Sequence, residues 1–181
     1  MYKHTFLKKI LLLSDTHGHM DQKISSYASQ ADEVWHAGDV GKTTVLEALE
    51  KLKPLRAVFG NIDGYQIRLQ TAEVLVFDCE GVKVVMTHIA GYPERYTTAA
   101  KELIKKHHPQ LFICGHSHIL KVIQDKKQGH LHMNPGAVGI SGFHKIRTML
   151  RFELDKGKIK NLEAIELGQR GSLTNTVNRT D

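Results

Sequence analysis

The chain has 181 residues, which is long enough for one domain with a substantial core. Its hydrophobic content of 41% and charged content of 24% are typical of a globular protein and argue against a disordered chain. The net charge of +6 is compatible with anionic partners but does not require them. Two isolated cysteines make no disulfide framework, and no apolar run approaches the ~18 residues of a membrane span. We therefore expect a cytoplasmic protein without membrane association.

The first part of the chain alternates short apolar runs with segments of helical periodicity. Predicted strands lie at 10–13, 32–39 and 55–59, and predicted helices lie between them at 20–30 and 43–52. Strands that alternate with helices in this way predict a parallel sheet joined by right-handed crossovers.

The second part of the chain contains more strands than helices. A hairpin is predicted from 74–77 and 82–86, followed by a helix at 95–107 and a buried strand at 111–114. Further strands are predicted at 120–124, 130–133, 149–154 and 159–165. Strands gathered late in the chain suggest a second sheet packed on the first.

The composition changes near the C-terminus. From residue 168 onward the chain is polar and rich in glycine and asparagine, which is typical of disorder. We therefore predict a single domain over 1–167 and a disordered tail over 168–181.

Polar side chains that can bind metals follow five of the apolar runs. If the backbone after the first strand stays extended, Asp15 and His17 point to the same side. Side chains at the carboxyl ends of several strands converge at one edge of a sheet, where open α/β sheets bind ligands. The candidate ligands are Asp15, His17, Asp39, Asn61, His88, His116 and His118.

The donor types of this set restrict the metal. Two carboxylates, one amide and four imidazoles, with no thiolate, suit Mn, Fe, Zn, Ni or Co rather than a structural cysteine-type zinc site. Seven donors exceed the needs of one tetrahedral ion. They suit two ions ~3.5–4 Å apart that share one carboxylate.

Glycines flank these candidate ligands. Gly18, Gly38, Gly60 and Gly115 each lie beside a polar residue at a strand end. We expect a positive φ or a close approach of neighbouring atoms at these positions, because glycine has no Cβ.

Other residues near the motifs have competing interpretations. His36 either positions a metal ligand or is a hydrogen-bonded core histidine. His130, His132 and His144 are predicted to be surface or edge-strand residues, and Cys114 an apolar core residue.

The ordered motifs resemble the calcineurin-like metallophosphoesterase superfamily. Asp15-x-His17, Gly38-Asp39, Gly60-Asn61, His88 and Gly115-His116-Ser117-His118 occur in the order of that family, over roughly residues 10–140. The short chain and the closing Asn134-Pro135-Gly136 look most like its small prokaryotic phosphodiesterase branch. Each motif alone is weak, but five in order, each after an apolar strand, are strong evidence.

The resemblance implies an α/β fold, specifically a four-layer α/β/β/α sandwich with two mixed β-sheets. It implies two divalent ions, with manganese expected and Zn, Fe, Ni or Co compatible. One ion would be held by Asp15, His17 and His118, and the other by Asn61, His88 and His116, with Asp39 bridging them. The residues implied in catalysis are Asp39, Asn61, Asp63 and His88.

The activity implied by the resemblance is hydrolysis of a small phosphodiester by a hydroxide that bridges the two metals. Many family members follow Gly-Asn with a histidine that protonates the leaving group, whereas Ile62 and Asp63 stand here. An ionised Asp63 donates no proton, so aryl or nucleotidyl esters with leaving groups of low pKa are favoured. His19 is an alternative candidate for assisting the leaving group.

Two other functions on the same fold remain alternatives. The retromer scaffold subunit resembles this branch and binds partners without need of catalysis, but a scaffold has no reason to keep a complete ligand set. A nuclease is compatible with the +6 charge, yet the sequence has no basic stripe interleaved with aromatic residues, so nucleic acid is not the expected partner. The resemblance also suggests a homo-oligomer, either a dimer or a tetramer.

Overall fold

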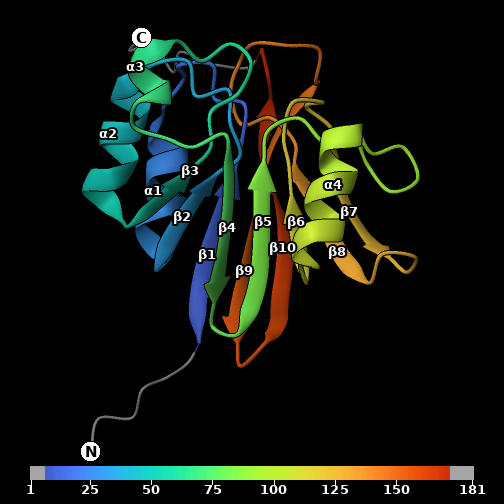
Figure 1. Cartoon of the computed structure of the whole chain (residues 1–181). Helices are drawn as coiled ribbons and strands as arrows, with labels where there is room; N and C mark the ends of the chain where they lie inside the picture. Colours follow the sequence, from blue (N-terminus) through green and yellow to red (C-terminus); the bar gives the residue numbers. More distant parts are fainter. Residues whose placement is uncertain (1–6, 172–181) are drawn as a thin grey trace, which may run out of the picture.

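The computed structural model describes residues 7–171, which form two sheets and four helices (Figure 1). The strands are β1 (Lys8–Leu13), β2 (Glu33–His36), β3 (Leu55–Ala57), β4 (Val74–Cys79), β5 (Val82–Thr87), β6 (Leu111–Ile113), β7 (Leu120–Asp125), β8 (His130–Pro135), β9 (Ile146–Asp155) and β10 (Lys158–Gln169). The helices are α1 (Gln22–Gln30), α2 (Thr43–Leu52), α3 (Tyr65–Arg68) and α4 (Thr98–His107).

Each sheet has five strands and mixes parallel with antiparallel neighbours. The strand orders are β10-β9-β1-β2-β3 and β4-β5-β6-β8-β7. The predicted parallel arrangement of β1, β2 and β3 is confirmed, as is the β4-β5 hairpin. The prediction that the late strands build the second sheet is wrong for β9 and β10, because β9 pairs antiparallel with β1 in the first sheet.

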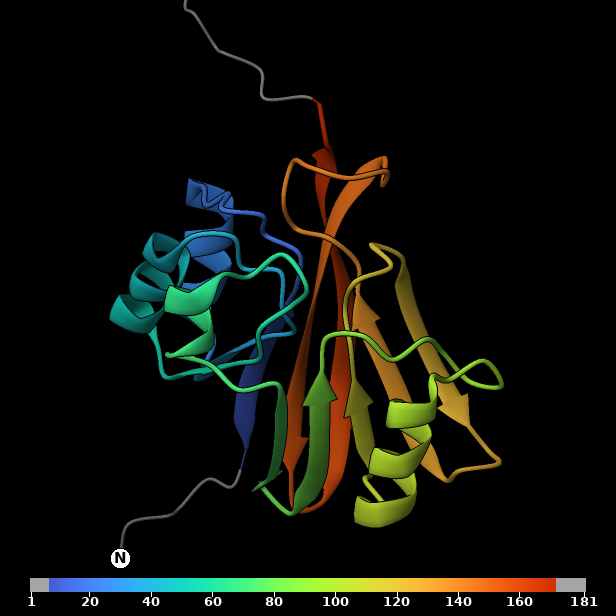
Figure 2. The same ribbon diagram turned by 45° about the horizontal axis from the view of Figure 1, so that its top comes forward.

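The predicted four-layer sandwich is confirmed by how the strands alternate their side chains. In β1, Ile10 and Leu12 pack between the two sheets, while Leu11 and Leu13 pack against α1 and α2. A third cluster fills the space between the second sheet and α4. Figure 2 shows α1 and α2 on one side of the paired sheets and α4 on the other. Because residues 10–13 of β1 are buried on both faces of the sheet, this part of the strand is apolar rather than alternating, whereas Lys8 and Lys9 lie at its more exposed start.

Helix starts are set by capping side chains. Asp21 accepts a hydrogen bond from the Ile24 amide, so α1 begins at Gln22. Thr97 accepts one from the Ala100 amide, which places the start of α4 at Thr98, three residues after the predicted start. The short α3 was not predicted, since its four residues carry no helical period.

The last strand runs past the predicted boundary of the folded region. β10 ends at Gln169, two residues beyond 167, and Arg170 donates hydrogen bonds to the carbonyls of His144 and Ile140. Residues 172–181 of the predicted tail lie outside the described residues.

None of the helices within residues 7–171 is both long enough and apolar enough to cross a membrane.

A single substitution in the core between the two sheets can test this packing. Leu12 is fully buried there, so Leu12→Ala should lower the free energy of unfolding by about 2–5 kcal/mol through lost burial and a residual cavity. The same change at Leu7, which is 40% exposed, should cost less than about 1 kcal/mol. Urea unfolding followed by circular dichroism measures both; equal losses would contradict this packing.

Candidate metal centre

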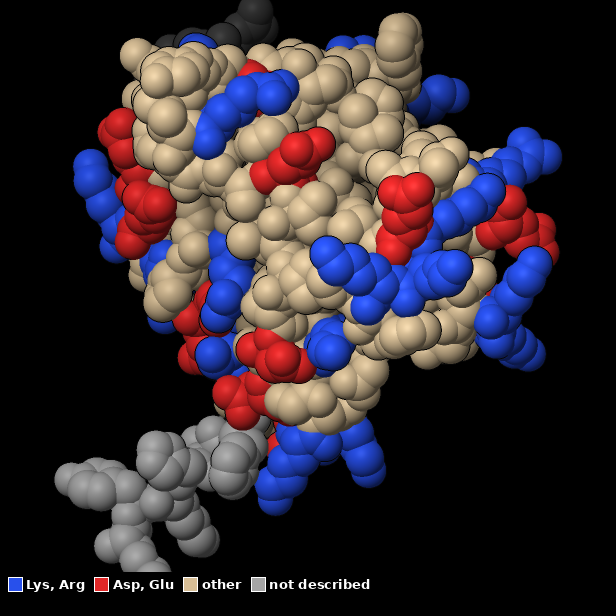
Figure 3. All heavy atoms as spheres, viewed as in Figure 1, with Lys and Arg blue, Asp and Glu red and all other residues tan. Residues whose placement is uncertain are grey.

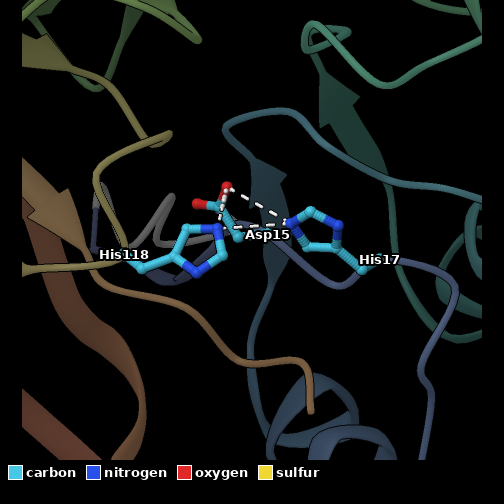
Figure 4. A group of neighbouring side chains, drawn as sticks. All are labelled: Asp15, His17 and His118. Atoms are coloured by element: carbon cyan, nitrogen blue, oxygen red, sulfur yellow. Dashed lines mark hydrogen bonds and ion pairs between the residues drawn. The ribbon is translucent and has the colours of Figure 1, made fainter. Parts of the chain in front are cut away.

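The carboxyl ends of four strands bring six of the seven predicted ligands into two groups. Asp15 and His17 follow β1 and meet His118, which follows β6. Asp39 follows β2 and meets His88 and His116. Within each group the donor atoms lie within 4.8 Å of one another. Figure 4 shows the first group, in which both imidazoles point at the Asp15 carboxylate.

The carboxylate of Asp39 lies between the two groups. Its Oδ1 is 3.2 Å from His88 Nε2 in its own group, and its Oδ2 is 3.6 Å from His17 Nε2 in the other group. Each oxygen of one side chain thus faces a different set of donors, which is the arrangement required of a bridging carboxylate.

Left-handed backbone, rather than extended backbone, brings the donors together. Positive φ is uncommon outside glycine, yet five of the predicted ligands adopt it. The φ values are 55° at Asp15, 47° at His17, 54° at Asp39, 68° at His116 and 57° at His118. The prediction that Asp15 and His17 point the same way in extended backbone is therefore wrong in its geometry. Such clustered strain is typical of functional sites.

The flanking glycines leave room for the ligands, as predicted. Gly38 has φ +98°, and a Cβ there would lie 2.5 Å from His88 Nδ1. A Cβ at Gly60 would overlap the Asp39 carboxylate. These two positions need glycine because a ligand side chain occupies the space that a Cβ would fill.

The donor set fits metal cations because its lone pairs face each other. His88 Nδ1 lies 2.7 Å from the Ala37 carbonyl and must donate its proton there, so the lone pair of the neutral ring is on Nε2. His88 Nε2 and Asp15 Oδ1 are both buried and have no hydrogen-bond partner among the described residues. Only positive charge, either a proton or a metal ion, makes such close approach of acceptors favourable.

The pKa shifts agree with a site that prefers positive charge. Burial raises the pKa of Asp39, but His88, the Ile62 amide and His17 together outweigh burial, and the net shift is downward. Burial lowers the pKa of His88, but Asp39, Asp15 and the Ala37 carbonyl together outweigh it, and the net shift is upward. The carboxylates therefore favour a cation at the Nε2 atom of His88.

His144 fixes the ring of His118 in the same way that Ala37 fixes His88. His144 Nε2 donates to the Gly139 carbonyl over 3.0 Å, which leaves its Nδ1 to accept from His118 Nδ1 over 3.2 Å. Burial, with the neighbouring His118 and Arg170, lowers the pKa of His144 and keeps its ring neutral. The lone pair of His118 is then on Nε2, 3.2 Å from Asp15 Oδ1. His144 is half-buried in the loop before β9, so it is not an edge-strand residue, and its contact with His118 was not predicted because a loop contact of this kind has no sequence signature.

Asn61 is the seventh predicted ligand. It is exposed in the loop after β3 and lines a cavity that His88 also lines. Its part in binding a metal stays a prediction.

The carboxylate of Asp63 binds backbone amides of two neighbouring loops. It is buried, and its two oxygens accept hydrogen bonds from the amides of Val40, Gly41 and Gly60 at 2.7–3.0 Å. These bonds hold the loop of Asp39 against the loop of Asn61. The structure thus shows Asp63 in contact with the backbone of both loops, and its catalytic role stays a prediction.

His36 also positions the ligand loops. It accepts from the Gly38 amide at Nδ1 and donates from Nε2 to Thr16 Oγ1, which in turn donates to the Val40 carbonyl. Complete burial lowers the pKa of His36 to about 4, so the ring stays neutral. Of the two interpretations from sequence, the structure shows the hydrogen-bonded core histidine, whose partners Gly38 and Thr16 are neighbours of candidate ligands in the chain.

A second polar cluster lies under α4. The Tyr96 hydroxyl is 2.9 Å from His130 Nε2 and 3.2 Å from His132 Nδ1, and both histidines are buried, so their prediction as surface or edge residues is wrong in exposure. Cys114 is buried beside His132, and burial raises the pKa of its thiol to about 12. A thiol of that pKa is no nucleophile at neutral pH, in agreement with the prediction of Cys114 as a core residue.

Comparison with known proteins identifies the family. The model of the calcineurin-like phosphoesterase superfamily domain matches residues 9–157. The chain belongs to this superfamily. Membership confirms the resemblance seen in the sequence and implies divalent metal ions and a phosphoric ester as substrate.

Curated relatives and solved structures agree with this assignment. Two proteins described as probable metallophosphoesterases are similar to the chain. That of Mycoplasma pneumoniae is 28% identical over 86% of this chain and 96% of its own, and that of Methanothermobacter thermautotrophicus is 26% identical over 70% and 74%. A structure described as a novel archaeal phosphodiesterase has a TM-score of 0.67 at 24% identity, covering 88% of this chain and 99% of its own. Zinc-bound Vps29 of Entamoeba histolytica has a TM-score of 0.66 at 16% identity, covering 87% and 98%. Both structures share the fold.

The contact between His144 and His118 can be tested through metal affinity. His144→Ala should weaken Mn²⁺ binding about 10–100-fold, because the ring of His118 loses the partner that fixes its tautomer and orientation. Calorimetric titration of metal-free protein measures the affinity. His107→Ala, at the end of α4, serves as the control and should bind like the wild type; unchanged affinity in the His144 variant would contradict the positioning role.

The buried His132 should make stability depend on pH. Burial lowers its pKa from 6.5 to about 4, so between these values the unfolded state binds a proton that the folded state does not, and stability falls as pH falls through this window. In His132→Gln the slope of unfolding free energy against pH should be smaller by up to about 1.4 kcal/mol per pH unit. Tyr96→Phe, which keeps His132, should retain the steep slope. Urea titrations from pH 4 to 7 measure it, and identical slopes in all three proteins would refute the assignment.

Proposed function

We propose that the protein is a metal-dependent phosphodiesterase that hydrolyses small phosphodiesters at a dinuclear metal centre. The observation that carries this proposal is the Asp39 carboxylate, which faces His17 of one donor group with one oxygen and His88 of the other group with its second oxygen. A single ion would use only one of the two donor groups.

Each residue of the centre has an assigned part. Asp39 serves both ions, and manganese suits their mixed oxygen and nitrogen donors, as do Zn, Fe, Ni and Co. Asp15, His17 and His118 would hold the first ion, and Asn61, His88 and His116 would hold the second. When bound, such a pair of ions makes a water molecule nucleophilic near neutral pH and neutralises charge on the phosphoryl oxygens.

The exposure of the ligands sets the side from which substrate arrives. Asp15, Asp39 and His88 are buried and form the floor of the centre. His116 and Asn61 are exposed, and His17 is half-buried, so these three border the solvent side. A phosphate group approaching from this side meets the imidazoles and the amide while the carboxylates stay beneath them.

The surroundings of the centre favour esters with good leaving groups. The Asp63 carboxylate is engaged by three backbone amides, and His19 Nε2 lies 3.1 Å from Asp21, the capping residue of α1. The Asp63 carboxylate has no proton to give to a leaving oxygen, and the Nε2 atom of His19 is engaged by Asp21. Aryl and nucleotidyl diesters, whose leaving groups need no protonation, are therefore the proposed substrates.

The complete donor set also weighs against a purely structural role. Buried carboxylates with unpaired oxygens, such as Asp15 Oδ1, cost stability unless a cation is bound. A scaffold that only binds partners would gain nothing from this arrangement, although the fold is shared with Vps29.

The bridging position gives the sharpest test of the proposal. Metal-stripped protein should hydrolyse bis(4-nitrophenyl) phosphate only after Mn²⁺ is added, and faster than it hydrolyses 4-nitrophenyl phosphate. Asp39→Asn halves the charge available to two ions, so it should lower the rate by at least about 100-fold and weaken binding of the metal. Release of 4-nitrophenolate and a metal titration measure the two effects.

Asp78→Asn on the exposed surface of β4 provides the matched control and should behave like the wild type. An undiminished rate in Asp39→Asn, or diester turnover by the fully metal-free wild type, would refute the dinuclear proposal. Two bound ions with no turnover of any diester would favour the scaffold instead.

A further inference from the structure

A cavity of about 410 Å³ adjoins the second donor group. It lies between the loop after β3, the short α3 and the start of α4, which Figure 1 shows on either side of the upper ends of β4 and β5. Its apolar lining comes from Phe59, Val74, Ile89, Ala99, Ala100 and Leu103. Its volume is within the range of small-molecule sites, about 300–1,000 Å³.

The cavity shares wall residues with the candidate metal centre. Asn61 and His88, two proposed ligands of the second ion, form part of its lining. A phosphate group held at the metals would therefore have this cavity beside it. Apolar walls beside polar donors are the usual composition of a site that binds the organic part of a substrate.

The charges in the cavity favour a neutral group over a second phosphate. Its charged residues, Arg68 and Glu73, have opposite signs. Figure 3 shows charges of both signs, with uncharged surface around them, between the positions of α3 and α4, whereas lysines and arginines gather farther right in the view. A further anionic group would gain little net attraction here.

Arg68 gives the cavity a flat wall. Its guanidinium lies 4.2 Å from the centre of the Phe59 ring and donates hydrogen bonds to the carbonyls of Asp63 and Gly60. These contacts hold the guanidinium plane in one place. Planar guanidinium and phenyl groups stack well on aromatic rings, which a flexible alkyl chain cannot match.

We propose that this cavity is the subsite for one ester group of the phosphodiester substrate and that it takes a neutral aromatic ring, as in an aryl or nucleotidyl ester. This inference rests on the proposed function, which it deepens by naming the class of alcohol. Ala99, exposed on the first turn of α4, is one of the residues that line the cavity.

A large side chain in the cavity tests this subsite without changing the metal centre. Ala99→Trp places a large ring where the substrate ring would bind and leaves every proposed ligand in place. Glu102→Trp, on the exposed surface of the same helix and outside the cavity lining, is the matched control. Unfolding midpoints of both variants establish that they fold.

Calorimetric titration of the Mn²⁺-loaded proteins with methylphosphonate and phenylphosphonate measures the contribution of the ring alone. The wild type and Glu102→Trp should bind phenylphosphonate at least about tenfold more tightly, equal to about 1.4 kcal/mol. Ala99→Trp should lose this preference and bind methylphosphonate as before.

Three results would overturn the subsite: equal affinity of the wild type for both phosphonates, an unchanged preference in Ala99→Trp, or a hexylphosphonate that binds more tightly than phenylphosphonate. These titrations need no turnover, so the subsite can fail while diester hydrolysis stands. A lack of hydrolysis with both phosphonates bound would instead refute the proposed function.

Discussion

The structure depends on one carboxylate that must face two sets of imidazoles at once. Asp39 does so because its backbone is left-handed, because Gly60 has no side chain to displace it, and because the Ile62 amide donates to its Oδ1. The same placement brings acceptor atoms of neighbouring histidines close to carboxylate oxygens. These acceptor atoms repel one another unless positive charge lies between them. The arrangement of side chains is therefore favourable only with a cation or a proton present.

The loops that carry the ligands are held by buried polar side chains that bind no metal. Asp63 joins the loops after β2 and β3 through three backbone amides, and His36 joins the loops after β1 and β2 through Thr16. These loops leave neighbouring parallel strands, so a short side chain can span the gap between them. Strained ligand conformations persist because such contacts, made in a well-packed region, restrict the alternatives.

The sequence predicts the identity of the ligands better than the geometry that unites them. An apolar strand followed by Asp15, Asp39 or His88 is a local pattern, and the parallel sheet follows from strands that alternate with helices. The pairing of β9 with β1 depends on contacts distant in sequence, and no local pattern encodes it. The left-handed backbone at the ligands escapes prediction for a similar reason, because tertiary contacts impose it against the preference of the residue. His144 shows the same limit, since its partner His118 lies 26 residues away.

The residue that follows the last strand connects the end of the chain to the candidate metal centre. Arg170 donates to the carbonyls of Ile140 and His144, and His144 in turn contacts His118. The segment that composition alone would assign to a tail therefore contains a residue that supports the loop of His144. A chain shortened to residue 167 would keep every proposed ligand yet lose part of the support that orients one of them. The residues that support the candidate metal centre thus extend further along the chain than the residues that form the hydrophobic core.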